Sequence, residues 1–174
     1  VPRAPIGRRA PNWPPGTQVH GEGLFLQFFE DRLADWAMRP GVGRQAAALR
    51  MGHRGWRTRR GLDPGPGYPG QRFALLHTLA HLLIRELALD CGYSAASNRE
   101  RVYAETEDGK SQAGILIYTA AADSDGTLGG LVELGKPENL GRLLRQAFAR
   151  AAVCASDPLC AEHNPRRDSS LHAA

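Results

Sequence analysis

The sequence is poor in cysteine and lysine, and it has no long uninterrupted apolar run. Its 174 residues include three cysteines and two lysines. An odd, small number of cysteines argues against a secreted scaffold held by disulfides. The longest apolar segment is broken by histidines and charged residues, whereas a membrane span needs about 20 mostly apolar residues. We therefore expect a cytoplasmic protein without a membrane span.

Sequence motifs for nucleotide hydrolysis and for serine hydrolases are also missing. There is no G-x-x-x-x-G-K-[ST] phosphate loop, no G-x-G-x-x-G after a strand and no G-x-S-x-G elbow. No internal repeat is found either. These absences exclude an ATP-driven motor and give no reason to expect a small-molecule substrate.

Positive charge is concentrated in the first part of the chain. Residues 1–70 hold 11 arginines against 5 acids, whereas residues 71–174 hold 11 lysines and arginines against 13 acids. Arginine binds phosphate in a planar, bidentate way that lysine does not share. The excess of arginine is thus consistent with phosphate recognition, and a GC-rich genome would produce the same bias.

The composition predicts one domain preceded by an arm. Residues 1–19 contain five prolines, which disfavour helices and central strands. Residues 20–174 are long enough for one core at a hydrophobic content of 42%. We expect a proline-rich and arginine-rich arm or linker at 1–19 and a single domain at 20–174.

The hydrophobic patterns predict an α+β fold, with a small, mainly antiparallel sheet covered by a buried central helix and a C-terminal amphipathic helix. The central helix is expected at Phe73–Asp90 and the C-terminal helix from Pro137, with two shorter helices at residues 30–39 and 43–50. The predicted strands are Gly23–Phe29, Arg101–Thr106, Ala113–Ala121 and Leu128–Leu134.

The central helix carries a polar stripe of His77, His81 and Arg85. Two histidines four residues apart on one helix face can share a metal ion. However, Thr78 stands where a metalloprotease has its glutamate, and no third ligand is evident in the sequence. We expect these side chains to be hydrogen-bonded where the helix crosses the sheet, near Tyr118 or Glu133. A hydrolase or nuclease centred on the stripe is the alternative.

A run of seven arginines without an acid extends from Arg39 to Arg60. Its end, with Arg54, Arg57, Arg59 and Arg60 around Trp56, could follow a phosphate backbone while the indole offers a stacking face. The run could equally be a solvated helix face or a contact with an acidic surface in a longer parent chain.

The cysteines near the end of the chain suggest a metal site. Cys154 and Cys160 are separated by five residues that include Asp157-Pro158, a turn former. Two thiolates joined by a turn provide half of a tetrahedral zinc site. The alternative is a pair of free thiols, because this spacing is not a standard zinc spacing.

Four segments in this order resemble a bacterial family. They are HTLAHLLIREL, CGYSAASNRERVY, GILIYTAAADSDGTLGGLV and CASDPLCAEHNP, and the resemblance covers residues 20–174. The family is the cysteine-bearing C-terminal domain shared by MrfA-type DNA-repair helicases and DrmB, the helicase-partner protein of the DISARM anti-phage system. The DrmB branch is the more similar.

The resemblance implies an accessory module that works with a superfamily 2 helicase and contacts proteins and DNA. It also implies a structural zinc held by four cysteines, of which Cys154 and Cys160 match the first pair. The second pair is expected just after Ala174, beyond this sequence, so the zinc site is incomplete within it.

Overall fold

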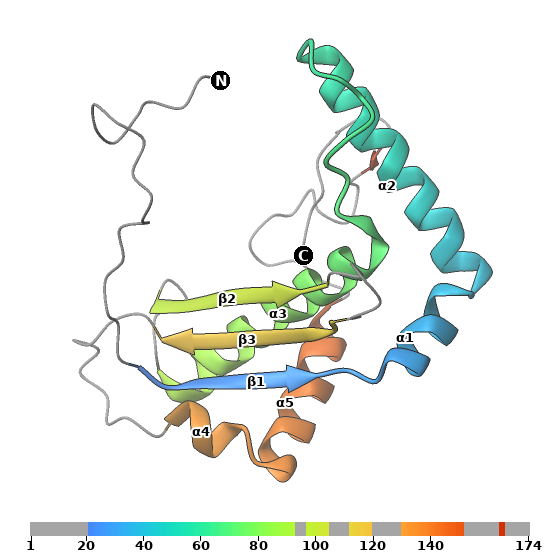
Figure 1. The fold of residues 1–174 in the computed structure, drawn as a ribbon. Helices are drawn as coiled ribbons and strands as arrows, with labels where there is room; N and C mark the ends of the chain where they lie inside the picture. The colour runs from blue at the N-terminus through green and yellow to red at the C-terminus, as the bar shows by residue number, and fades with distance from the viewer. Residues whose placement is uncertain (1–20, 93–96, 105–111, 120–129, 152–163, 166–174) are drawn as a thin grey trace, which may run out of the picture.

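The computed structural model describes residues 21–92, 97–104, 112–119, 130–151 and 164–165. Its centre is a three-stranded antiparallel sheet in the order β1-β3-β2 (Figure 1). The strands are β1 (Gly23–Gln27), β2 (Asn98–Tyr103) and β3 (Gly114–Thr119). The predicted arm at 1–19 lies outside the described residues.

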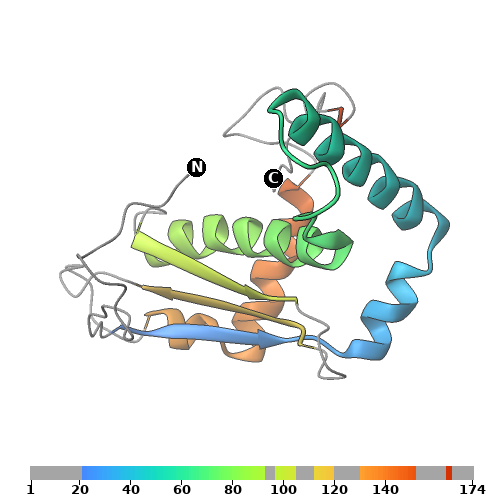
Figure 2. The same ribbon diagram turned by 45° about the horizontal axis from the view of Figure 1, so that its top comes forward.

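Helices cover one face of this sheet. The central helix α3 (Gly70–Cys91) packs against β2, β3 and the C-terminal helix α5 (Pro137–Arg150). Figures 1 and 2 show α3 and α5 on the same side of the strands. Both helices were predicted, and the α+β fold is confirmed. Gly92 ends α3 in the left-handed conformation, φ 69°, as expected of a helix stop.

The core lies between the covered face of the sheet and the helices. Its fully buried members come from every layer and include Leu76, Leu83, Leu87, Ile115, Ile117, Leu131 and Leu143. Strand alternation directs Ile115 and Ile117 inward because successive side chains of a strand point to opposite faces. Burial of these aliphatic side chains is the main force that holds the layers together.

Two further helices connect β1 to α3 along one side of the molecule (Figure 1). Helix α1 (Glu30–Ala37) ends before Pro40, as predicted. Helix α2 (Pro40–Arg59) begins at that proline instead of at Gly43. Proline is favourable in the first turn of a helix, because the backbone N–H that it lacks would have no partner within the helix there. It also runs nine residues past the predicted end at Arg50. None of the described helices is long and apolar enough to cross a membrane.

The strand predicted at Leu128–Leu134 is wrong. Residues Gly130–Leu134 form the short helix α4, which buries Leu131 completely against the core. A segment this short can bury one leucine as a strand or as a helix. The apolar run in the sequence therefore did not distinguish the two. The strand predicted at Arg101–Thr106 also begins earlier than expected, at Asn98.

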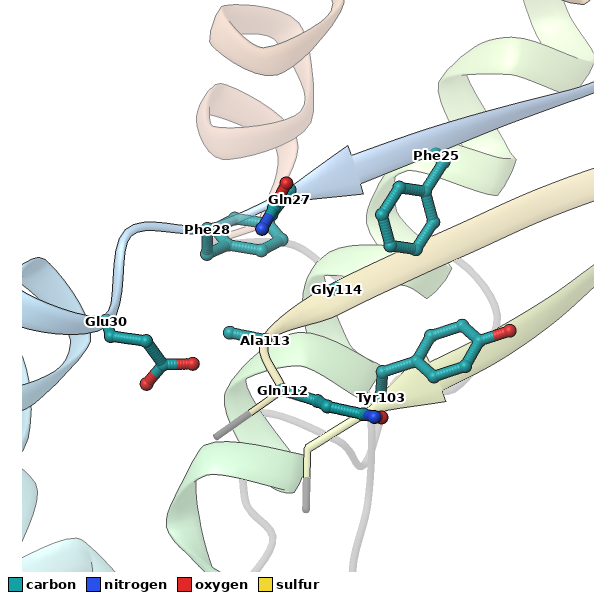
Figure 3. A pocket seen from close by; sticks show the side chains of 8 residues that line it. All are labelled: Phe25, Gln27, Phe28, Glu30, Tyr103, Gln112, Ala113 and Gly114. Atoms are coloured by element: carbon teal, nitrogen blue, oxygen red, sulfur yellow. The ribbon is translucent and has the colours of Figure 1, made fainter. Parts of the chain in front are cut away.

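The other face of the sheet carries no described helix. Register places Phe25 and Arg101 beside Leu116, one on each side of the central strand. Figure 3 shows Phe25 and Tyr103 over the strand that contains Gly114, next to a hollow of about 440 Å³. The Phe25 and Tyr103 rings meet edge to face, with centroids 5.8 Å apart.

Candidate metal centre

Helix α3 brings two imidazoles together. His77 and His81 are one helical turn apart, so their side chains project from the same face. Their rings meet edge to face with centroids 4.6 Å apart, and the two Nε2 atoms are separated by 3.1 Å. Phe73, one turn before His77, packs its ring against that imidazole at 5.2 Å between centroids.

Strand β2 supplies a carboxylate to the same place. Asn98, Glu100 and Val102 alternate with Arg99, Arg101 and Tyr103 along this strand. Because alternate side chains point to opposite faces, the first three turn toward α3. Glu100 thus reaches the histidines from the covered face of the sheet, whereas Arg99 and Arg101 are exposed.

The three side chains converge on one point. Glu100 Oε1 lies 2.9 Å from His77 Nε2 and 3.3 Å from His81 Nε2. Each residue therefore offers one atom of the kind that binds metals, and all of these atoms lie within 4.8 Å of one another. The glutamate is a possible third ligand that was not evident from the sequence.

The cluster is partly shielded from water. The side chains of Glu100, His77 and His81 are 18%, 30% and 50% exposed, so the site opens to solvent on the His81 side. Partial burial lowers the pKa of the His77 imidazole below its ordinary value, and the nearby Glu100 carboxylate opposes that shift. A neutral imidazole has the free lone pair that metal binding requires.

The polar stripe was predicted to meet Tyr118 or Glu133. The histidines contact Glu100 instead, and nothing in the sequence pattern indicates that contact. Arg85 follows two turns after His77 on α3 and is half-buried. It does not belong to the group of three side chains that could hold a metal ion.

The four arginines predicted to bind nucleic acid lie at the end of α2, but in different surroundings. Arg54 and Arg59 are exposed, and within the described ranges no hydrogen bond or ion pair engages either side chain. The guanidinium of Arg57 donates to the carbonyl of Asp63, holding the loop that leads to α3. Arg60 places its guanidinium 4.4 Å from the centroid of the Trp56 ring, where stacking on DNA was expected.

The predicted cysteine ligands, Cys154 and Cys160, lie outside the described residues. Within the described part of the chain, two imidazole nitrogens and a carboxylate oxygen form a donor set that zinc accepts in proteins.

Two comparisons with known proteins bear on this fold. Residues 79–169 match the family model of the MrfA Zn-binding domain. The chain is also 36% identical over 168 residues to the DISARM protein DrmB of Bacillus paralicheniformis. That alignment covers 92% of this chain and 28% of the relative, so the chain spans less than a third of that protein's length.

Proposed function

This chain belongs to the MrfA Zn-binding domain family, and on that premise we propose that it is a DrmB-like, non-catalytic accessory domain of a DISARM anti-phage defence complex. In this role it contacts a superfamily 2 helicase and DNA. The observation that carries the proposal is the 36% identity to a DISARM DrmB protein over nearly the whole chain.

The helicase contact is proposed from the resemblance of the sequence motifs to the family shared with MrfA-type helicases. It is tested in cells that express the complete defence system. Affinity purification of the full protein should recover a superfamily 2 helicase encoded in the same gene cluster. Recovery of the protein without any helicase, under conditions that preserve protection against phage, would contradict the proposed partnership.

The DNA contact is supported by the position and the basic composition of α2. This helix lies along one side of the molecule, away from the sheet (Figure 1), and it contains no acid over its 20 residues. Arg50, Arg54 and Arg59 are exposed on it. Exposed arginines without competing carboxylates attract a phosphate backbone, and release of counterions makes such binding dependent on salt.

The four predicted arginines should contribute unequally to DNA binding. Arg54 and Arg59 are exposed and available for phosphates, whereas Arg57 and Arg60 hold the following loop and cover Trp56. Replacing Arg54 and Arg59 together with alanine should weaken binding of labelled DNA and reduce the slope of log affinity against log salt by about 2. Fluorescence anisotropy measures both quantities.

The matched control removes the same charge elsewhere. Arg32 on α1 and Arg145 on α5 are exposed, and their joint replacement by alanine leaves α2 intact. This control should retain most of the salt dependence. Equal losses in the two double variants would show that only net charge matters, and no binding at low salt would eliminate the DNA contact.

The structural zinc of the family is proposed for Cys154 and Cys160. Two thiolates supply half of a tetrahedral set, and further donors must complete it. Metal analysis of the full protein should show less zinc when both cysteines are replaced by serine. Unchanged zinc content in that variant would remove the cysteines from the metal site.

A further inference from the structure

We propose that His77, His81 and Glu100 form a second metal site, separate from the cysteines, that binds a zinc ion between α3 and β2. The three donors come from two elements that meet only in the folded chain. The bound ion would act as a clamp between the helix and the edge strand of the sheet, with a water molecule in the fourth position.

The spacing of the donor atoms fits a tetrahedral ion. Zinc–nitrogen and zinc–oxygen bonds of about 2.0–2.1 Å place tetrahedral ligands about 3.3 Å from one another. The three observed separations are 2.9, 3.1 and 3.3 Å. Each lies within about half an ångström of the ideal value, so small side-chain rotations suffice to admit the ion.

The carboxylate itself gives a second, independent reason. Glu100 Oε2 is buried and has no hydrogen-bond partner among the described residues. A buried carboxylate oxygen without a partner is costly. A metal ion beside Oε1 would compensate this cost, because it neutralises the carboxylate and can be approached by either oxygen.

Hydrogen bonding alone accounts for the cluster less well. Both imidazoles approach the same oxygen, Glu100 Oε1, and their own Nε2 atoms are 3.1 Å apart. If both nitrogens carried a proton directed at Oε1, the two N–H groups would converge and Oε2 would stay unpaired. An ion accepts lone pairs from both nitrogens and from the carboxylate at once.

The donor set also indicates the class of metal. Imidazole nitrogens favour zinc and its transition-metal neighbours, whereas magnesium and calcium prefer sites made entirely of oxygen. The exposed side of His81 leaves room for water in the remaining position. Zinc is therefore the probe of choice, with magnesium as the negative control.

The test uses the whole chain with Cys154 and Cys160 both replaced by serine, so that these two thiolates cannot contribute. After removal of metal by a chelator, calorimetric titration should show one zinc bound per chain and no binding of magnesium. A 100-fold excess of zinc over its dissociation constant should raise the melting temperature by about 5–10 °C. Cobalt substituted at the site should lack a thiolate charge-transfer band.

Single replacements then locate the ion. His77→Ala, His81→Ala and Glu100→Gln should each weaken zinc binding by at least about 100-fold, while circular dichroism shows the helices intact. Glu100→Gln is the sharpest variant because it keeps the shape of the side chain. The control is His53→Ala on α2, whose ring faces the carbonyl of Pro66 instead.

Two results would overturn the proposal. One is the absence of zinc binding in the serine variant at millimolar zinc. The other is zinc binding that Glu100→Gln and His77→Ala leave unchanged, since the ion would then lie elsewhere.

Discussion

The two faces of the sheet are built from the same three strands and serve different purposes. On β2, Glu100 turns toward α3 and meets two histidines, while its neighbours Arg99 and Arg101 turn the other way and are exposed. On β3, Ile117 is fully buried and Leu116 is only half-buried. The alternation of side chains along a strand decides whether a residue belongs to the core, the histidine–glutamate cluster or the surface.

The largest effect that this contrast predicts is on stability at β3. Replacing Ile117 with alanine should lower the free energy of unfolding by about 2–5 kcal/mol, because it opens a cavity in the core. The adjacent change Leu116→Ala, on the open face, should cost about 1 kcal/mol or less. Urea denaturation of both variants measures the difference. Equal losses would contradict the division into a covered and an open face.

A smaller difference in stability is expected between variants that break one or the other of two ion pairs that join α3 to α5. Glu86 is 2% exposed and accepts from Arg150 through both carboxylate oxygens, at 3.0 and 3.2 Å. Asp90 pairs with Arg142 nearer to solvent. Arg150→Ala should cost about 1–3 kcal/mol because it leaves a buried carboxylate unpaired, whereas Arg142→Ala should cost about 0–1 kcal/mol.

Chemical denaturation separates these two pairs, and a double variant identifies the cause. In the Arg150→Ala background, Glu86→Gln removes the buried charge and should recover part of the lost stability. If the double variant is less stable than Arg150→Ala alone, the loss comes from the packing of the arginine stem and not from the stranded carboxylate.

The smallest predicted effect is on stability at Gly114, where the open face is tightly packed against Phe25. A Cβ added to Gly114 would lie 2.7 Å from Phe25 Cζ, so the ring would have to move. Gly114→Ala should cost about 1 kcal/mol for this displacement. In a variant that also carries Phe25→Ala, the cost of Gly114→Ala should largely disappear, which a double-mutant cycle measures. Additive losses would place the strain in the backbone.

Much of this fold could be predicted from the sequence because its main elements have strong patterns. The long apolar helix α3 and the strand β3, with its buried isoleucines, were identified at nearly their observed positions. Leu128–Leu134 was assigned wrongly because five residues with one buried leucine satisfy a strand or a helix equally. The extent of α2 was missed because its mixed composition gives little periodicity.

Only two of the three residues of the histidine–glutamate cluster could be grouped from the sequence. His77 and His81 are joined by helical spacing, which can be read directly from the sequence. Glu100 joins them through the packing of α3 on β2, a contact between segments about 20 residues apart that spacing alone does not reveal. The strand was also expected to begin at Arg101, one residue after the glutamate, and only Val102 marks its inward face as apolar.

The most direct test of the central claim is anomalous diffraction from crystals of this chain grown with zinc. The account predicts an anomalous peak about 2 Å from His77 Nε2, His81 Nε2 and Glu100 Oε1, and no such peak in crystals of the Glu100→Gln variant. Crystals in which zinc is found only beside sulfur, with the three side chains joined by hydrogen bonds alone, would contradict it.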